Sequence, residues 1–266
     1  MRLTGASVVI VGASGGIGSA TARAFARAGA NLTLAAPESE RAPLEERARE
    51  AREAGVQALA VSVDVTERAQ IDRLIELSLQ RFGRIDVLVN LAGIGSAPSL
   101  CESTDEEIAL VFNVNLVGCA RLMHAALPVM KAQGCGSIVN VGSIAGEAGV
   151  MGVYSASKFG MRGLTDSVRR EVRSHGVRVT LIEPGFVRTA MNAAMGEGLP
   201  SPDVVADAIV DAVRRPRRVR IVPKRYVLPI VLARAFPGLL DVVFGHPRIQ
   251  HRLNRDARAE RARGSR

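Results

Sequence analysis

The sequence predicts an α/β fold, in which about seven parallel strands form one doubly wound sheet with helices on both faces. Short β-branched runs alternate with longer helical patterns through the first 220 residues. Several of those runs are apolar almost throughout, as is typical of strands that are covered on both faces. The chain of 266 residues is also long enough to bury one large core without disulfides or metals.

Each predicted strand is a short run rich in valine, isoleucine, leucine or alanine. Side chains branched at Cβ pack well on a pleated surface, so such runs favour strands. The seven predicted strands are Ser7–Val11, Asn31–Ala35, Ala58–Ser62, Val87–Asn90, Ser137–Val141, Arg178–Ile182 and Arg220–Val222.

The stretches between the strands carry helix signals. Glycine closes three of them, at Gly29, Gly55 and Gly176, where a left-handed residue ends the last turn. Ser201 and Pro202 supply an N-cap and a first-turn proline for the last one. The six predicted helices are Gly16–Ala28, Ala42–Ala54, Arg68–Arg81, Glu106–Lys131, Ser155–Ser174 and Asp203–Arg214.

The net charge of +9 is concentrated in the last fifth of the chain. Residues 1–213 carry 20 Lys and Arg against 23 Asp and Glu, whereas residues 214–266 carry 15 against 3. A nearly neutral body argues against nucleic acid as a partner. Cys101, Cys119 and Cys135 lack CxxC spacing, which argues against a disulfide framework or a structural zinc, and no metal site is expected.

The chain enters an apolar strand that is too short for a signal-peptide core, and no run approaches 18 uninterrupted apolar residues. These observations predict a cytoplasmic protein without a transmembrane span. The alternating pattern stops after Val222, so residues 1–222 are predicted as the domain and residues 223–266 as an extension. The extension contains the apolar, proline-broken stretch Tyr226–Phe244 and an Arg-rich tail from Arg248.

A glycine-rich loop follows the first predicted strand and opens the first helix. Glycine permits a tight turn and a close approach to a pyrophosphate, which the free N–H groups of the helix N-terminus would bind. A glycine-rich turn without a ligand is the alternative. The residues expected to hold the phosphates are Gly12, Ser14, Gly15, Gly16, Ile17 and Gly18.

Five further features follow in a fixed order. Asn90-Leu91-Ala92-Gly93 ends the fourth predicted strand, and Asn115 lies within the fourth helix. Ser143 comes just after the fifth strand, and Tyr154-Ser155-Ala156-Ser157-Lys158 is a YxxxK sequence. Pro184-Gly185-Phe186-Val187-Arg188-Thr189 follows the sixth strand.

This ordered set, with the glycine loop, resembles the short-chain dehydrogenase/reductase family over residues 5–222. The resemblance implies a Rossmann-type domain, an NAD(P) cofactor, a carbonyl or alcohol substrate, and a homodimer or homotetramer. The cofactor-binding residues that it implies, besides the glycine loop, are Asp64, Val65, Asn90, Ala92, Gly93, Tyr154, Lys158, Pro184, Gly185, Val187 and Thr189.

Residue types alone also suggest the chemistry at Tyr154 and Lys158. Four residues apart on a helix, they share one face. A nearby ammonium stabilises a phenolate, so the phenol could exchange a proton with a substrate oxygen while hydride moves at carbon. Ser143 could hydrogen-bond the same oxygen. The resemblance adds that Lys158 grips the nicotinamide ribose and that Asn115 supports a water-mediated proton relay.

Each of these residues also has a structural alternative. Tyr154 and Lys158 could be a helix-surface pair, and Ser143 a turn or capping serine. Asn115 could bond nearby backbone, and Asp64 could be a helix N-cap. The interval of 11 residues from Ser143 to Tyr154 is shorter than is usual in the family, so the intervening loop must close more tightly.

The end of the second strand bears on the choice of cofactor. The position at which family members that use NAD carry an acidic residue falls on Ala36, which slightly favours NADP(H). Pro37 stands where NADP-preferring members often carry arginine. Arg41 could bind a 2′-phosphate, but Glu38 and Glu40 oppose it.

Mostly apolar residues are candidates for the substrate wall, which predicts a lipophilic ketone or alcohol. They are Ile94, Gly95, Ala148, Met151, Phe186, Met191 and Met195.

Three interpretations of Tyr226–Phe244 compete. The first is a core-covering helix with a solvated tail, the second is peripheral contact with an anionic membrane, and the third is nucleic-acid attachment. For the whole chain, the alternative to an enzyme is a non-catalytic dinucleotide-binding or membrane-associated scaffold of the same fold.

Overall fold

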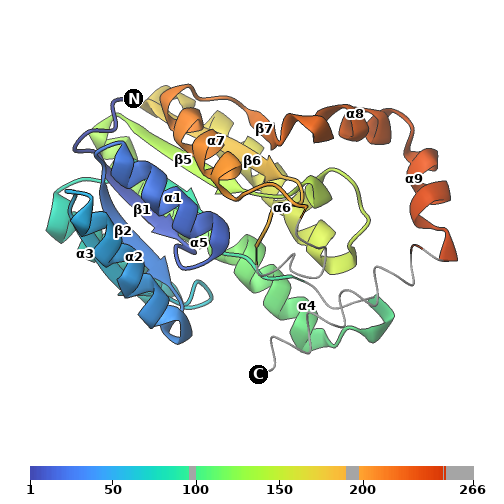
Figure 1. Ribbon diagram of the computed structural model, residues 1–266, viewed down its shortest axis with the longest axis horizontal. Coiled ribbons are helices and arrows are strands. Elements are labelled where there is room, and N and C mark those ends of the chain that lie inside the picture. The colour runs from blue at the N-terminus through green and yellow to red at the C-terminus, as the bar shows by residue number, and fades with distance from the viewer. Residues whose placement is uncertain (96–99, 190–197, 248, 250–266) are drawn as a thin grey trace.

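The computed structural model describes residues 1–95, 100–189, 198–247 and 249. Within them, seven parallel strands form one sheet in the order β3-β2-β1-β4-β5-β6-β7 (Figure 1). The strands are β1 (Ser7–Val11), β2 (Asn31–Ala36), β3 (Ala58–Ser62), β4 (Val87–Asn90), β5 (Gly136–Val141), β6 (Val177–Pro184) and β7 (Val219–Val222). The predicted strands are therefore confirmed, with ends that differ by one or two residues.

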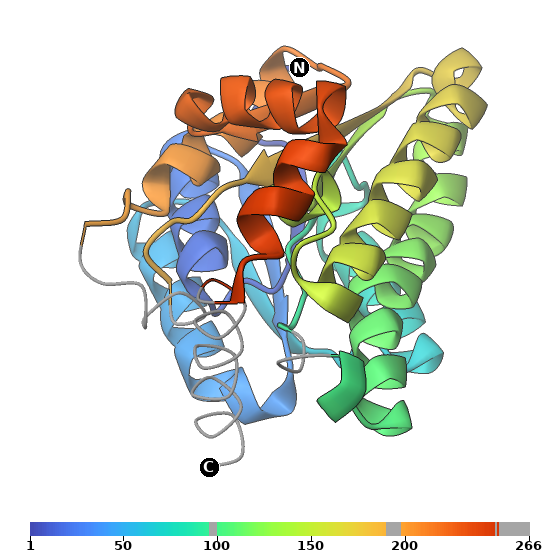
Figure 2. The same cartoon turned by 90° about the vertical axis from the view of Figure 1, so that its right-hand side faces the viewer.

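Helices cover both faces of the sheet (Figures 1 and 2). The helices of the domain are α1 (Gly16–Arg27), α2 (Arg41–Glu53), α3 (Arg68–Phe82), α4 (Asp105–Phe112), α5 (Cys119–Gln133), α6 (Gly152–Glu171) and α7 (Asp203–Arg214). One core joins α1, α2 and α7 to the sheet, and a second core joins α3, α5 and α6 to its other face. Every residue of β1, β4 and β5 is buried, because both faces are covered.

The strand order reverses at β1. Val11, the last residue of β1, pairs with Ala35 of β2 on one side and with Asn90 of β4 on the other. Loops that leave such neighbouring strands in opposite directions form a crevice at their carboxyl ends, where ligands of doubly wound sheets bind. The glycine loop leaves β1 at this point.

The helix predicted over Glu106–Lys131 is continuous but uneven. A π-helical turn, Asn113–Gly118, separates α4 from α5. The run Asp105–Gln133 is long and apolar enough to cross a membrane by length and composition. It lies against the sheet, however, with Leu122 and Met130 fully buried, and we interpret it as a core helix.

The extension forms two short helices, α8 (Val227–Ala235) and α9 (Pro237–Phe244), after the 3-10 turn Lys224–Tyr226. Figure 1 shows them as an arm that leads away from the end of β7. Ile230 is the one buried residue of α8. The first interpretation of this stretch, as a core-covering helix, is therefore wrong, because most of its apolar side chains face outward. The tail from residue 250 onward lies outside the described residues.

Candidate active site

The glycine loop is shaped for close contact with a ligand. Gly12 has a φ of +87°, and a Cβ on it would lie 2.9 Å from the backbone of Leu91 and Ala92. A side chain there would push β1 and β4 apart, so glycine is required. A Cβ on Gly16 would lie 3.2 Å from Thr189, which places the glycine loop against the segment that follows β6.

The glycine loop leads directly into the N-terminus of α1. Its N-cap residue, Gly15, makes no side-chain hydrogen bond, and the first turn carries no acidic residue. The first N–H groups of a helix need acceptors, and the helix dipole favours an anion there. The loop and the helix end together fit the pyrophosphate of a dinucleotide.

Tyr154 and Lys158 are neighbours in the first turns of α6. They are only 9% and 5% exposed, and the Lys158 Nζ atom lies 5.5 Å from the centre of the Tyr154 ring. Lys158 Nζ also donates a hydrogen bond of 3.5 Å to the carbonyl oxygen of Val141, which is the last residue of β5. The pair is therefore not an ordinary helix-surface pair, because both side chains are held at the carboxyl edge of the sheet.

Asn115 ties the π-helical turn to the loop after β4. Its Oδ1 accepts from the N–H of Ile94 at 2.8 Å, and its Nδ2 donates to the Ile94 carbonyl at 3.0 Å. Nδ2 also donates to Ser157 Oγ at 3.0 Å. A Cβ on Gly93 would lie 3.2 Å from Asn115 Oδ1 and 3.3 Å from Lys158 Nζ, so Gly93 brings these two side chains close.

Ser143 lies just beyond β5, half-buried and with an extended backbone. Its Oγ accepts from the N–H of Ala145 at 3.1 Å and so caps a short 3-10 turn. The capping interpretation is therefore correct, but a capping oxygen still holds a proton that it can donate to a substrate oxygen.

Some of the other predicted cofactor-binding residues can offer only backbone atoms to the crevice, whereas others expose a side chain. The side chain of Asn90 donates to Asn140 Oδ1 at 2.6 Å in the interior, so only its backbone is available at the edge. Val65 and Val187 are buried, and their backbones alone can contribute. Asp64 is exposed and accepts from the N–H and the hydroxyl of Thr66, so it also organises the start of α3.

The Pro184–Gly185 turn is covered by an aromatic ring that sequence reasoning missed. A Cβ on Gly185 would overlap the ring of Tyr226, which also lies 6.5 Å from the ring of Phe186 in an edge-on arrangement. Phe186 and the half-exposed Met151 remain available for a substrate wall. Met191 and Met195 lie outside the described residues.

The chain also carries buried charges that the sequence pattern did not single out. Arg162 of α6 binds Glu183 of β6 at 2.8 Å and also contacts Glu147, and both carboxylate side chains are 1% exposed. Arg234 of α8 contacts Glu147 as well. Burial outweighs these cations at Glu183 and raises the pKa of its carboxyl. Only the tertiary structure places these residues together.

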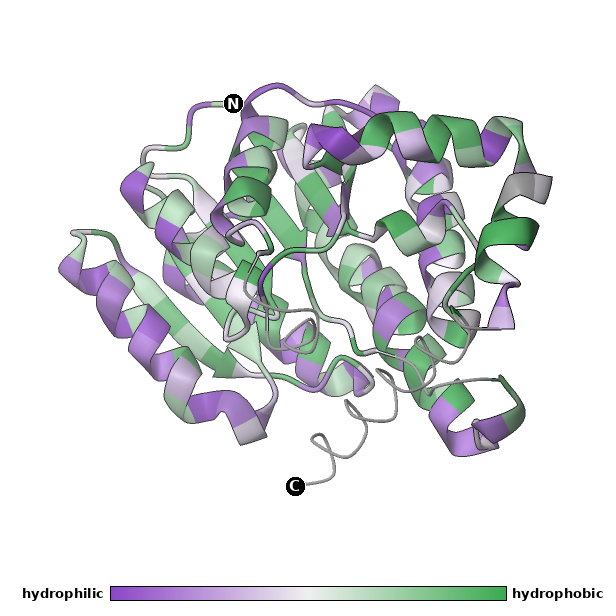
Figure 3. Ribbon diagram, turned by 45° about the vertical axis from the view of Figure 1, so that its right-hand side comes forward, coloured by the Kyte–Doolittle hydropathy of each residue, from purple (hydrophilic) through white to green (hydrophobic). Residues whose placement is uncertain are grey.

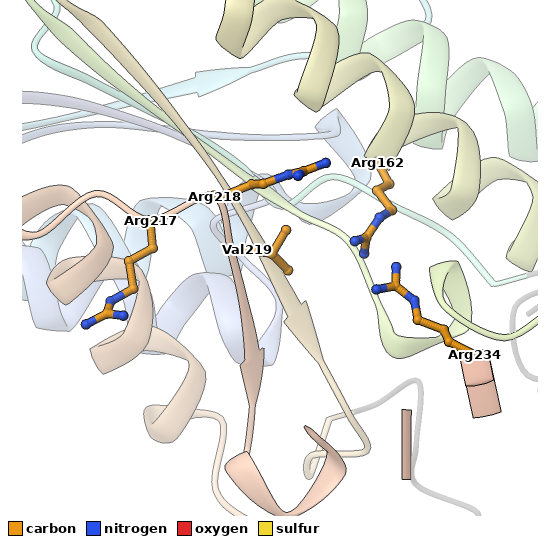
Figure 4. Close-up of a pocket in the computed structure, with 5 residues that line it drawn as sticks. All are labelled: Arg162, Arg217, Arg218, Val219 and Arg234. Atoms are coloured by element: carbon orange, nitrogen blue, oxygen red, sulfur yellow. The ribbon is translucent and has the colours of Figure 1, made fainter. Parts of the chain in front are cut away.

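These arginines border a cavity of about 780 Å³ that is lined by Arg162, Arg217, Arg218, Val219 and Arg234. In Figure 4, Arg162 and Arg234 point toward one another, Arg218 points into the same space, and Arg217 points away. Because Glu147 follows Ser143 and Glu183 precedes Pro184, this charge network links the two loops that flank the crevice.

The end of β2 carries opposing charges. Ala36 is buried, and the carboxylate of Glu40 accepts from the hydroxyl of Ser14 in the glycine loop. Arg41 pairs with Glu38 at 3.3 Å. The hydroxyl of Ser62, more than Arg41, lowers the pKa of Glu38. A 2′-phosphate would therefore meet two carboxylates and one arginine.

Comparison with known proteins agrees with this geometry. Residues 6–199 match the short chain dehydrogenase family. The chain is 38% identical over 199 residues to "3-oxoacyl-[acyl-carrier-protein] reductase FabG" of Thermotoga maritima, covering 74% of this chain and 80% of the relative. It is 35% identical over 221 residues to "Ketoacyl reductase HetN" of Nostoc, covering 80% and 76%.

A solved structure of a short chain dehydrogenase/reductase from Burkholderia phymatum in complex with NAD superposes with a TM-score of 0.82. It is 28% identical and covers 90% of this chain and 96% of its own. Fold and site thus define an oxidoreductase that acts on carbonyl and alcohol groups. The chain belongs to the short-chain dehydrogenase/reductase family.

Proposed function

We propose that this protein interconverts a lipophilic carbonyl compound and its alcohol by hydride transfer with NAD(P). The observation that carries the proposal is the placement of Tyr154 and Lys158, 5.5 Å apart and buried, beside Gly93 and Asn115 at the carboxyl edge of the sheet. A proton donor, its cation and a dinucleotide cradle there share one crevice.

The proposed catalytic residues are Asn115, Ser143, Tyr154 and Lys158. The nicotinamide, when bound, supplies or accepts the hydride at carbon. The phenol of Tyr154 donates a proton to the carbonyl oxygen in reduction and accepts it back in oxidation. Ser143 donates a hydrogen bond to the same oxygen, and Lys158 stabilises the phenolate. Asn115 holds the loop after β4 against Lys158.

The cofactor would lie along the glycine loop, with its pyrophosphate at the N-terminus of α1. The absence of a side-chain cap on α1 and the contact between Gly16 and Thr189 support this position. The neighbour from Burkholderia phymatum was crystallised with NAD, which supports a nicotinamide dinucleotide. Asp64 would face the adenine, as the family resemblance implies.

A lipophilic substrate is supported by the solvent-accessible apolar side chains Phe186 and Met151 and by the relatives named "Ketoacyl reductase HetN" and "3-oxoacyl-[acyl-carrier-protein] reductase FabG". We expect reduction of 3-oxoacyl thioester analogues and apolar ketones, with a kcat/KM at least tenfold higher for long than for short chains, because each added buried CH2 contributes about 0.8 kcal/mol. A panel of ketones, aldehydes and alcohols is followed by the fluorescence of NADPH and NADH separately. Failure to turn over any member with either cofactor would contradict the proposal.

Cofactor choice is proposed to lean slightly to NADP(H), because Ala36 leaves no carboxylate at the end of β2. Glu40, in contact with Ser14, limits that lean by repelling a 2′-phosphate. We expect Glu40→Gln to raise the ratio of kcat/KM for NADPH over NADH by about threefold to tenfold, as loss of one charge a few ångströms away allows. The gain should shrink in high salt. Glu53→Gln, at the far end of α2, is the control. Equal changes of the NADPH to NADH ratio in both variants would show that the charge of Glu40 does not affect cofactor choice.

We also propose a cytoplasmic homo-oligomer, a dimer or a tetramer. α4 and α6 pack together and expose Leu110 and Phe159, apolar residues that suit a contact with a second copy. Peripheral contact of residues 223–266 with a membrane would be separate from the catalytic reaction, and it has its own support in α8 and α9.

A further inference from the structure

Helix α8 is oriented against the usual rule for a surface helix. Seven of its nine residues are exposed, and all of these except Arg234 are apolar: Val227, Leu228, Pro229, Val231, Leu232 and Ala235. Leu228 is 66% exposed and Val231 is 53% exposed. A solvated helix normally turns its apolar stripe inward and its charges outward. The outward face of α8 therefore needs a non-aqueous partner.

The one charged residue of α8 faces the protein and fixes this orientation. Arg234 contacts the carboxylate of Glu147, a side chain that is 1% exposed in the segment between Ser143 and Tyr154. Figure 4 shows Arg234 pointing toward Arg162 of α6. Ile230 is buried on the same side, and Tyr226 packs on Gly185 just before the helix. Rotating α8 to hide its apolar face would break the contact with Glu147 and leave that carboxylate with less compensation. The exposed face is thus built into the fold.

The apolar surface continues along the arm. Phe236 is 62% exposed between the two helices, and Val242 of α9 is 74% exposed. Figure 3 shows both helices coloured largely as hydrophobic. Scattered exposed apolar residues need no explanation, but a contiguous set on one projecting element indicates an interaction surface.

Basic residues border this surface. Lys224 and Arg225, both exposed, lie at the start of the arm. Further along, the sequence from 248 to 266 contains seven arginines against Asp256 and Glu260. Asp241 is the one acidic residue in the sequence from 223 to 249. An apolar face flanked by Lys and Arg is the pattern that binds the surface of an anionic bilayer.

We propose that α8 and α9 dock this protein on an anionic membrane surface, with the face of Leu228 and Val231 in the acyl boundary and Lys224 and Arg225 at the headgroups. A second copy of the chain fits less well, because a two-fold contact through this face would bring identical basic flanks together. Docking here also sets the carboxyl edge of the sheet near the bilayer, since the arm begins where β7 ends and Tyr226 touches Gly185.

The test is vesicle flotation of the full-length protein, with phosphatidylcholine vesicles that contain or lack phosphatidylglycerol. We expect binding to the anionic vesicles, weaker binding to the neutral ones, and loss in high salt. Leu228→Ser with Val231→Ser should weaken binding at least tenfold, because each large apolar side chain contributes about tenfold to a partition constant. Lys224→Glu with Arg225→Glu should weaken binding to the anionic vesicles and leave binding to the neutral vesicles unchanged. Leu100→Ser, also 66% exposed but on the loop before α4, should bind like the unchanged protein.

Reductase activity on a soluble ketone and the unfolding midpoint show that each variant is folded. The proposal is overturned if the unchanged protein does not bind anionic vesicles, or if Leu228→Ser with Val231→Ser binds as tightly. Light scattering tests the alternative occupant, a second copy of the chain. If the unchanged protein does not bind vesicles and the Leu228→Ser, Val231→Ser variant has a lower molecular mass than the unchanged protein, the apolar face is an interface between two copies. Because activity is measured separately, failure of membrane docking leaves the proposed reaction untouched.

Discussion

Replacing Tyr154 by phenylalanine is expected to lower kcat by about 10²- to 10⁴-fold, the range that a positioned acid–base group contributes. The substitution removes one hydroxyl and keeps the ring that packs near Lys158. Cofactor affinity should therefore change little, and the loss should fall on kcat rather than on KM. The measurement is steady-state kinetics in both directions, with cofactor binding followed by fluorescence.

The chain offers a matched control for this variant, since it contains only two tyrosines. Tyr226→Phe removes the other phenolic hydroxyl and keeps the ring on Gly185. We expect its kcat to stay close to that of the unchanged protein. Unaltered turnover by Tyr154→Phe, or an equal loss in both variants, would show that the acid–base assignment is wrong.

Replacing Arg162 by methionine is expected to lower the free energy of unfolding by about 3–5 kcal/mol, the usual cost of breaking a buried ion pair on one side. Glu183 would lose the cation that hydrogen-bonds it, and Glu147 would lose one of its two arginine contacts and keep Arg234. Both carboxylates are almost fully buried, so water cannot compensate. Arg49→Met, which breaks exposed pairs with Glu46 and Glu53, should leave stability nearly unchanged.

The loss in Arg162→Met should depend on pH. Burial already raises the pKa of Glu183, and removal of Arg162 raises it further. A carboxyl whose pKa is raised in the folded state stabilises the fold at low pH and loses that contribution as pH rises through the folded-state pKa. Urea unfolding should therefore show a smaller deficit at pH 5 than at pH 8. A deficit independent of pH would mean that lost packing, not the unpaired carboxylate, causes it.

The sequence alone predicted the sheet, the helices on both faces and the residues expected at the site. The fold prediction is confirmed, because parallel strands buried on both faces carry strong apolar runs. The roles of the site residues stay predictions, which rest on the glycine loop and the YxxxK pair as local patterns. Element ends differed by a few residues, as at α6, where helix formation begins at Gly152 rather than at Ser155.

The tertiary structure decided what depends on distant segments. Asn90 turned its side chain to Asn140, fifty residues away, which no local pattern reveals. The network of Glu147, Arg162 and Glu183 joins a loop, a helix and a strand. The orientation of α8 is the clearest case: its sequence fits a helix covering the core, but the attraction between Arg234 and buried Glu147 turns the apolar face outward. The sequence determines which side chains a segment contains, whereas the tertiary contacts determine which of those side chains are buried and which are exposed to solvent.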